Sequence, residues 1–356
     1  MKRLDRYLLR EMAPTVGGAA LTFVVLLVGH MLYTVVEVVV ERGVPLPSVM
    51  HFLALKVPEA AVMALPVSML LGSALAFNRL QTDRELTVVR ASGVSFVRIM
   101  VPAAVMGLAV AVLVLVLNEW VAPKCEEASR RLLMEAVSQQ KALAFTPKKF
   151  LQLSDTDFVY PDEVDPKHDR LVGVKMFMLG GDNPPVLVEA PEAVFVGGKL
   201  IAPRARTFAP EWSGDVAWGN VSTVTVALKS DSLYLPGDLG AMRGLSLGEL
   251  WHNWQDEKAR YPQEAARFEL EFHARLAMAA AALVMALLAG PLTVSVGKGH
   301  SMSGVALSLG IVFLYYLGML WLRLAGDRGV LPPVAAAWGE NGALLVLTGW
   351  LIYRLR

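Results

Sequence analysis

Residues 99–118 read IMVPAAVMGLAVAVLVLVLN, twenty consecutive positions without an acidic or basic side chain. An α-helix needs about 20 mostly apolar residues to cross the ~30 Å hydrocarbon core of a bilayer. This stretch is therefore long enough to span a membrane by itself. The whole chain agrees with a membrane protein, because 55% of its 356 residues are hydrophobic and only 18% are charged, whereas soluble domains carry about 25% charged residues.

Four further stretches of comparable length also lack charged side chains. They are Met12–Val36, Ala60–Asn78, Leu276–Gly297 and Ser301–Leu322. A sixth candidate, Leu331–Tyr353, contains a single charge at Glu340, and we expect its helix to begin near Val334. The sequence thus predicts six transmembrane helices, three before and three after a long polar segment.

Basic residues predict the orientation of these helices. The first span follows a basic start like that of a signal peptide, but it is longer than the usual ~7–15-residue core, so we expect it to remain as an anchor. With the N-terminus inside, the cytoplasmic segments contain Lys2, Arg3, Arg6, Arg10, Arg79, Arg84, Arg90, Arg98, Lys298, Arg354 and Arg356, and the short outer loops contain only Arg42, Arg323 and Arg328. By the positive-inside rule, both termini are cytoplasmic and Glu119–Arg275 lies outside the cytoplasm.

The external segment changes character along its length. A polar stretch, Lys124–Lys141, and a later one, Leu245–Arg275, have helical composition. Between them lie short β-rich runs separated by Gly and Pro turns: Phe150–Leu153, Phe158–Tyr160, Val172–Leu179, Val186–Glu189, Ala193–Val196, Leu200–Ala202 and Val221–Leu228. Several short antiparallel strands predict a sandwich or roll. We therefore divide the chain into residues 1–122 (three spans, with a cytoplasmic helix at 80–95), 123–270 (β-domain with flanking helices) and 271–356 (three spans).

The cytoplasmic loop at residues 80–95 reads LQTDRELTVVRASGVS. Thr82 and Glu85 have the spacing of a capping box, and Gly93 can end a helix. Leu86 and Val89 would form its apolar edge. The pattern predicts a short amphipathic helix at the inner membrane face, which is either a connector without a special role or a coupling helix that docks in a groove of a soluble motor protein.

The chain contains no motor sequence of its own. A phosphate-binding loop requires G-x-x-x-x-G-K-[ST], and the nearest match, Gly297-Lys298-Gly299, lacks the first glycine and the Ser or Thr. The run Gly299–Ser303 resembles part of a serine-nucleophile elbow but lacks its final glycine. We therefore expect no catalytic residue and no cofactor in this chain, and any ATP would be hydrolysed by a separate subunit.

Two other classes of site are disfavoured. A net charge of +1 argues against a nucleic-acid binder, and a single cysteine, Cys125, argues against a disulfide framework or a cysteine-rich metal site. The acidic run Asp162–Asp169 lacks the ligand spacing of a calcium loop and predicts a solvated turn. His252, Asp256 and Glu257 have helical spacing, which a surface helix face explains as well as a metal would.

Charged residues also cluster near the outer ends of the spans, where they are costly unless they have a role. His30, Glu37, Lys56, Glu59 and Glu340 are examples. They can pair with one another, as Lys56 could with Glu59 one turn later, or basic members can hold anionic lipid headgroups. The headgroup candidates are Arg42, Lys56, Arg323 and Arg328.

The order and spacing of several segments resemble the permease subunits of the lipopolysaccharide exporter (LptF/LptG type), somewhat closer to the F-type paralogue. These segments are Leu4–Glu11, Leu65–Gly72, Glu85–Leu86, Arg90–Ser95, Asn118–Pro123, Glu269–Leu276, Pro291–Leu292 and Leu331–Pro333, with Trp338 and Asn341. The resemblance implies a bacterial inner-membrane subunit that pairs with a second, G-type permease and is served by a cytoplasmic ABC ATPase dimer, which would bind ATP and Mg²⁺.

The resemblance also implies where the partners bind. The helix that docks on the ATPase would contain Asp83, Arg84, Glu85, Leu86, Arg90, Ala91 and Gly93. The external domain would be a periplasmic β-jellyroll that passes the lipid to a bridge of similar domains (LptC/LptA type). The first span of one partner and the fifth span of the other would form a lateral gate, and Arg42 would lie near the lipid phosphates.

The resemblance thus implies a permease subunit that extracts lipopolysaccharide, or a related anionic glycolipid, from the outer leaflet of the inner membrane. Moving an acyl chain out of a bilayer costs about 0.8 kcal/mol per CH₂, so a lipid with several chains requires an energy source and a sheltered apolar route. Two alternatives remain open: a secondary transporter, suggested by the three-plus-three arrangement, and a membrane-anchored scaffold or protease with an external β-domain.

Overall fold

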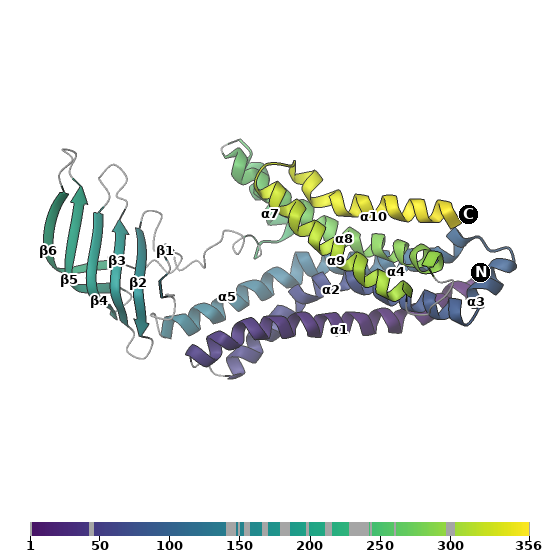
Figure 1. Ribbon diagram of the computed structural model, residues 1–356, viewed down its shortest axis with the longest axis horizontal. Coiled ribbons are helices and arrows are strands. Elements are labelled where there is room, and N and C mark those ends of the chain that lie inside the picture. The colour runs from purple at the N-terminus through teal and green to yellow at the C-terminus, as the bar shows by residue number, and fades with distance from the viewer. Residues whose placement is uncertain are drawn as a thin grey trace. The chain divides into compact units, whose positions relative to one another are not determined.

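The computed structural model describes residues 2–42, 46–139, 147–148, 150–152, 157–165, 170–178, 186–196, 199–210, 216–227, 242, 244–259, 261–296 and 303–355. They form two compact units. The first contains Met1–Val35, Met50–Ala128 and Ala241–Arg356, and the second contains Val36–Val49 and Ser129–Gly240. The first unit is helical and the second contains the β-sheet, in line with an external β-domain inserted between two sets of helices (Figure 1).

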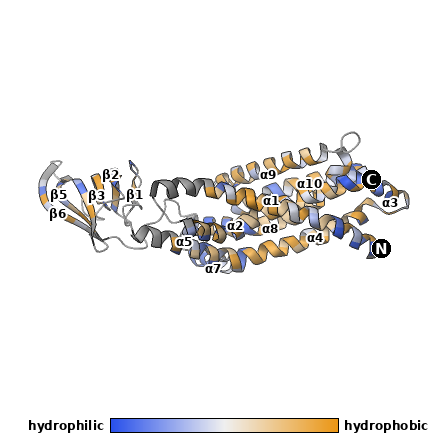
Figure 2. Ribbon diagram, turned by 90° about the horizontal axis from the view of Figure 1, so that it is seen from below, coloured by the Kyte–Doolittle hydropathy of each residue, from blue (hydrophilic) through white to orange (hydrophobic). Residues whose placement is uncertain are grey.

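Five segments of the described chain are long and apolar enough to cross a membrane. They lie in α1 (Lys2–Arg42), α2 (Leu46–Thr82), α4 (Phe96–Val116) with the helical residues that follow it up to Ser129, α8 (Pro262–Val296) and α9 (Ser303–Asp327). Hydrophobic residues dominate along these helices and polar ones gather near their ends (Figure 2). The uncharged runs of the sequence predicted all five.

The predicted sixth span coincides with a helix. This helix, α10 (Pro333–Leu355), begins one residue before the expected Val334 and has 23 residues, enough for about 34 Å. Its mean hydropathy is lowered by Glu340 and Asn341, both of which are buried, and it is not among the five segments above. A sixth span therefore stays a prediction.

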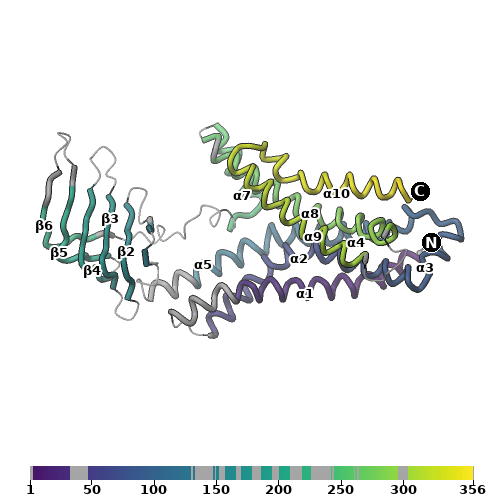
Figure 3. Tube along the Cα trace, in the orientation of Figure 1, coloured from purple at the N-terminus to yellow at the C-terminus, as the bar shows by residue number. Residues whose placement is uncertain are grey.

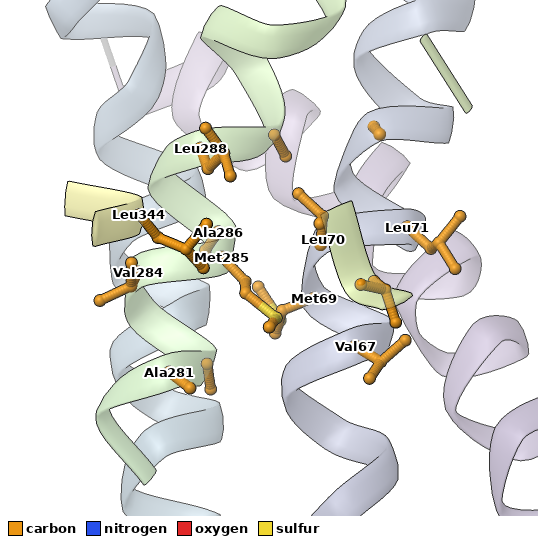
Figure 4. Close-up of a cluster of buried hydrophobic side chains, with 14 of the residues drawn as sticks. Val67, Met69, Leu70, Leu71, Ala281, Val284, Met285, Ala286, Leu288 and Leu344 are labelled. Atoms are coloured by element: carbon orange, nitrogen blue, oxygen red, sulfur yellow. The ribbon is translucent and has the colours of Figure 1, made fainter. Parts of the chain in front are cut away.

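α2 and α8 form the centre of the helical unit. Their most apolar windows are 78% and 72% buried, whereas those of α1 and α9 are only 6% and 22% buried. Met285 of α8 reaches toward Met69 of α2 in the core (Figure 4). Small residues allow the backbones to approach: a Cβ added at Gly107 of α4 would lie 2.7 Å from the Cβ of Ala286, as is typical of helix contacts in membranes.

The β-unit contains one antiparallel sheet whose strands follow sequence order. The strands are β1 (Leu151–Gln152), β2 (Asp157–Asp165), β3 (Arg170–Met178), β4 (Val186–Val196), β5 (Lys199–Pro210) and β6 (Val216–Ala227). Val159 pairs with Met176, which in turn pairs with Val188, and all three are buried. The helix α5 (Ala122–Gln139) precedes the sheet. The predicted antiparallel β-domain is confirmed, and among the described strands its order is that of a meander.

Three neighbouring strands of this sheet have irregular backbone at positions that face one another. Gly173 has φ +62°, and a Cβ there would lie 2.5 Å from the Oδ2 of Asp162 on the neighbouring strand. The strand registers place Gly173 opposite Pro191, and Pro191 opposite Arg204, which has φ +56°. A residue in the left-handed region interrupts the extended backbone of its strand. The sheet therefore bends along this line, which favours a roll over a flat sheet.

Several sequence-based boundaries are corrected. The runs Val186–Glu189 and Ala193–Val196 are one strand, because Pro191 lies where the ladder is already irregular. The first half of the acidic run, predicted as a solvated turn, is the end of β2, and residues 166–169 lie outside the described part of the chain. The helix expected over Leu245–Arg275 is split into α7 (Leu247–Glu257) and α8, which begins at Pro262, a residue suited to the first helical position.

Candidate functional site

The predicted cytoplasmic helix is α3 (Glu85–Ala91), which lies between α2 and α4. It occupies the same end of the helical unit as the N- and C-termini (Figures 1 and 3). The chain enters it through Arg84, which has φ +59°, and leaves it through Gly93, which has φ +88°. Gly93 thus ends the helix as expected, since a residue in the left-handed conformation commonly follows a helix C-terminus.

The predicted capping box is wrong. Thr82 is the last residue of α2, and its hydroxyl donates to the Asn78 carbonyl at 2.9 Å. No side chain caps α3, and the left-handed Arg84 makes the turn instead. The physical reason is that the apolar face of α2 continues through the buried Leu80, so the helix extends past the position where the cap pattern would begin a new one.

The inner face of α3 is anchored to the other helices. Leu86 is buried in a cluster with Leu8, Leu80, Phe96 and Ile99, and Val89 packs against its edge. Glu85, partly buried, accepts a hydrogen bond from the Tyr7 hydroxyl at 2.7 Å. Arg90 donates to the Leu355 carbonyl at 3.3 Å and lies over the Phe96 ring. These contacts hold α3 against α1, α4 and the end of α10.

The opposite face of α3 is open. We call Arg84, Thr87, Val88 and Ala91 the docking face; all four side chains are exposed, and Val88 is 67% exposed. Asp83 and Gly93 lie exposed at its two ends. An apolar centre with a charged rim is the arrangement of many protein interfaces. An exposed valine on so short a helix is therefore suited to a partner protein.

The structure separates the residues predicted for docking into two groups. Asp83, Arg84, Ala91 and Gly93 are exposed, whereas Leu86 points into the chain, so Leu86 can only fix the helix. Thr87 and Val88 were not singled out from the sequence. Their signal was their position: they lie between the two inward-facing residues, Leu86 and Val89, and so face away from the apolar edge.

Two of the headgroup candidates are neutralised within the chain. Lys56 forms ion pairs with Glu59, at 3.0 Å, and with Glu126. The guanidinium of Arg323 pairs with Glu271. Arg328 is exposed and forms no ion pair with any described residue. Arg42 ends α1, but its side chain lies outside the described part of the structure.

A buried polar hub lies in the first half of α8, toward the end that the sequence predicts to lie outside the cytoplasm. Glu271 and Arg275 are 8% and 9% exposed, and the Arg275 Nε lies 3.1 Å from the Glu271 Oε1. The other guanidinium nitrogens of Arg275 donate to the carbonyls of Met242, at 2.8 Å, and Leu245. We call Glu271, Arg275 and Arg323 the outer hub. It ties the segment before α7 to α8 and α9.

That the chain holds no metal ion stays a prediction, since it also concerns residues outside the part that the structure describes. No group of three or more His, Cys, Asp or Glu side chains in that part of the chain could hold an ion. His252 lies 3.5 Å from Asp256 on an exposed helix face. This is the helix-face alternative that the sequence left open for these residues.

The start of α7 predicts a local pH dependence. Glu249 accepts hydrogen bonds from the backbone N–H and the hydroxyl of Ser246, at 2.7 and 2.9 Å, and these bonds lower its pKa from the ordinary 4.5. A lowered folded-state pKa means that the stabilisation is present above pH 4.5 and is lost as the pH falls through the lower value. Because Glu249 is exposed, the effect is small and screened.

We therefore expect the hydrogen-exchange protection of the α7 amides to fall as the pH decreases below about 4.5. Glu249→Gln keeps an acceptor oxygen but cannot ionise, so its α7 protection should not change over this pH range. Exchange measured by mass spectrometry on peptides covering Leu247–Glu257 checks this. If the α7 protection of Glu249→Gln still fell with pH as it does in the unmodified chain, another group would cause the dependence.

Apolar helices, an inserted β-domain and a short helix with one exposed face fit a class of protein, the membrane transport subunits or permeases. Residues 6–354 match the family described as "Lipopolysaccharide export system permease LptF/LptG". The chain belongs to this family. Membership confirms the resemblance in the sequence and makes the chain a transport subunit rather than an enzyme.

Curated relatives agree with the family over most of their length. The chain is 23% identical over 352 residues to the lipopolysaccharide export system permease protein LptF of Escherichia coli K12 and, with the same figures, to that of Shigella flexneri; the match covers 96% of this chain and 92% of each relative. It is 26% identical over 313 residues to the permease protein LptG of Escherichia coli K12, covering 84% of each chain. Both paralogues are thus relatives.

Proposed function

We propose that the chain is one half of an ATP-driven permease pair in the bacterial inner membrane, with both termini cytoplasmic and the β-domain periplasmic. It extracts lipopolysaccharide, or a related anionic glycolipid, from the outer leaflet and passes it through the β-domain to periplasmic bridge proteins. The observation that carries this proposal is the docking face of α3 at the inner end of a membrane helix bundle. A chain that lacks its own phosphate-binding loop but presents such a face is suited to bind a separate ATPase subunit.

The packing of the helices supports a second permease as the other half. α1 and α9 are the first and fifth predicted spans, and they are the least buried of the five apolar segments. Large side chains along them are exposed, including Leu21 and Val25 on α1 and Phe313 and Trp321 on α9. These are the spans that would form the lateral gate. The longer match to LptF supports an F-type assignment, although identity is slightly higher to LptG.

The β-domain has the surface that an acyl chain requires. Its buried face is formed by aliphatic and methionine side chains on four successive strands, among them Val159, Leu171, Met176, Val188 and Leu200. Burial on such a face offsets the cost of removing each CH₂ from the bilayer. A sheet that bends along one line can cover this face from two sides, as a jellyroll does.

One edge of the sheet is suited to a bridge protein. β6 has twelve residues, VAWGNVSTVTVA, without a charge, and among the described strands it pairs only with β5. Unpaired strands of this kind commonly carry charges or prolines that prevent association. Because β6 has neither, its backbone is available to accept a strand from a similar domain.

The outer hub and Arg328 leave room for a headgroup. Arg323 pairs with Glu271 but remains 36% exposed. Arg328, one residue past the end of α9, is exposed. These two arginines can attract phosphate, while Lys56 contributes less because two carboxylates pair with it.

A secondary transporter is the second candidate, because α9 and α10 contain polar groups suited to an ion pathway. Within the described part of the chain, the buried Tyr315 hydroxyl and the Glu340 Oε2 have no hydrogen-bond partner. Buried ionisable groups in membrane helices often mark such pathways. Transport that continues without ATP and stops in Glu340→Gln would favour this alternative.

Native mass spectrometry of the gently purified complex tests the proposal. We expect one copy of this chain, one second permease, two ATPase subunits and bound lipopolysaccharide in one assembly. A chain that purifies without any ATPase and without acyl lipid would contradict the proposal.

A further inference from the structure

The first turns of α1 are joined to the α3 region by three polar contacts. The Tyr7 hydroxyl donates to the Glu85 carboxylate at 2.7 Å. Asp5 pairs with Arg98 of α4 at 2.6 Å, and Glu11 pairs with Arg79 at the end of α2. We call these three contacts the inner clamp. They tie one end of α1 to the end of α2, to α3 and to the start of α4, which are the elements on either side of the docking face.

Apolar packing reinforces the inner clamp. Leu4, Tyr7 and Leu8 of α1 line a pocket with Leu86 and Val89 of α3. Further along, α1 and α2 approach closely at Gly72, where an added Cβ would lie 2.4 Å from the Cα of Val16. Leu8, Met12 and Val16 are the buried apolar residues among the described side chains of α1.

Over residues 17–32, α1 has little packing within the chain apart from Phe23, which packs against the core. Leu21, Val25 and Leu26 are 67%, 62% and 61% exposed. Because α1 is held at its first turns and is mostly exposed over residues 17–32, it should move together with the element that holds it. A shift of α3 would therefore reach the exposed part of α1 through the inner clamp.

We propose that Tyr7 is a positioning residue that couples α3 to α1: its hydroxyl, through Glu85, makes the first turns of α1 move with α3 when the ATPase acts on the docking face. The inference rests on the proposed function, because it requires a motor at α3. It adds a route by which movement at the inner membrane face reaches the least packed span. Asp5 and Glu11 support the same attachment from either side of Tyr7.

In this structure the Glu85 carboxylate faces α1. Glu85 is partly buried and turned toward Tyr7, whereas Thr87 and Val88 point away from α1. Removing the Tyr7 hydroxyl should therefore leave the docking face intact. Binding of the ATPase and movement of α1 become separable in the Tyr7→Phe variant.

The test uses the full complex of this chain, its permease partner and the ATPase, reconstituted with lipopolysaccharide in proteoliposomes. Two quantities are measured: ATP hydrolysed, and lipopolysaccharide released per ATP. We expect Tyr7→Phe to keep ATPase binding and hydrolysis while release per ATP falls about fivefold, the effect of losing one hydrogen bond of ordinary net strength. Tyr353→Phe, at a tyrosine that is 79% exposed at the same end of the unit, is the matched control and should match the unmodified chain.

A double-mutant cycle with Glu85→Gln separates positioning from general destabilisation. If Tyr7 acts through Glu85, the double variant should release about as much lipid per ATP as Tyr7→Phe alone, because interacting residues are not additive. A spin-label distance between Val25→Cys on α1 and a label on the ATPase should change on ATP addition in the unmodified chain, and this change should shrink in Tyr7→Phe.

The outcomes are distinct. Normal release per ATP in Tyr7→Phe, with the ATPase bound, overturns the inference and leaves the proposed function standing. A parallel loss of ATPase binding, hydrolysis and release shows a merely structural role and also overturns it. An unmodified complex that does not bind the ATPase, or does not release lipid with ATP, overturns the proposed function and the inference together.

Discussion

A chain that carries Val88→Asp should no longer co-purify with the ATPase. Val88 lies at the centre of the docking face and is 67% exposed, so a partner that covers α3 would bury it. An unpaired carboxylate buried at an interface costs several kcal/mol, and loss of a central apolar contact commonly costs about 2 kcal/mol or more. Even a loss of only about 2–4 kcal/mol would weaken binding by roughly 30- to 800-fold.

Co-purification and ATPase stimulation in the full complex measure this effect. Tyr261→Asp is the matched control, because it places the same charge at a 59% exposed apolar side chain at the opposite end of the helical unit. The control should bind the ATPase normally. Normal binding by Val88→Asp would show that the docking face is not the site of the motor, whatever the state of the inner clamp.

The largest loss of stability is expected from Arg275→Met. Arg275 and Glu271 are both buried, and Arg275 also satisfies the carbonyls of Met242 and Leu245. Methionine fills a similar volume but leaves those carbonyls without their donor and Glu271 with Arg323 alone. Removing one partner of a buried ion pair typically costs about 3–5 kcal/mol.

Thermal unfolding in detergent, followed by tryptophan fluorescence, measures this loss. Trp251 of α7 contacts Phe272 of α8 with ring centroids 5.3 Å apart, so it reports on the region around the outer hub. Arg10→Met, at an exposed arginine of α1, is the control and should unfold like the unmodified chain. Equal unfolding temperatures for Arg275→Met and the control would contradict the role of the outer hub.

The sequence predicted the helices well because membrane spans depend on a local property. A run without charges is visible in the residues themselves, and its length alone decides whether it can cross a bilayer. α3 was also predicted from Leu86, Val89 and Gly93. Its cap was not, because whether Thr82 ends one helix or starts the next depends on how far α2 remains packed.

The pairing of distant charges could not be predicted in the same way. Lys56 with Glu59 follows from spacing, but Glu126 and the Glu271–Arg323 pair depend on which helices become neighbours. The exposure of the docking face also depends on which helices become neighbours of α3. Leu86 was predicted on the apolar edge of α3, but the residues that cover it, Leu8, Leu80 and Phe96, come from α1, α2 and α4.

The β-domain contains one feature that the sequence predicted, the pairing of its strands, and one that it did not, the continuity of β4. Their existence follows from β-rich runs between turns, and sequential strands joined by short turns pair in order. The proline at 191 suggested a break between two strands, yet β4 runs through it because the facing Gly173 and Arg204 are irregular at the same level. Such a shared bend exists only once the strands are aligned.

ATP-dependent release of lipopolysaccharide tests the central claim most directly. Proteoliposomes containing this chain, its permease partner, the ATPase and lipopolysaccharide are incubated with a soluble bridge protein, and the lipid transferred to that protein is measured. The account predicts transfer with ATP and none with a non-hydrolysable analogue. Transfer that proceeds without ATP, or ATP hydrolysis that moves no lipid, would contradict it.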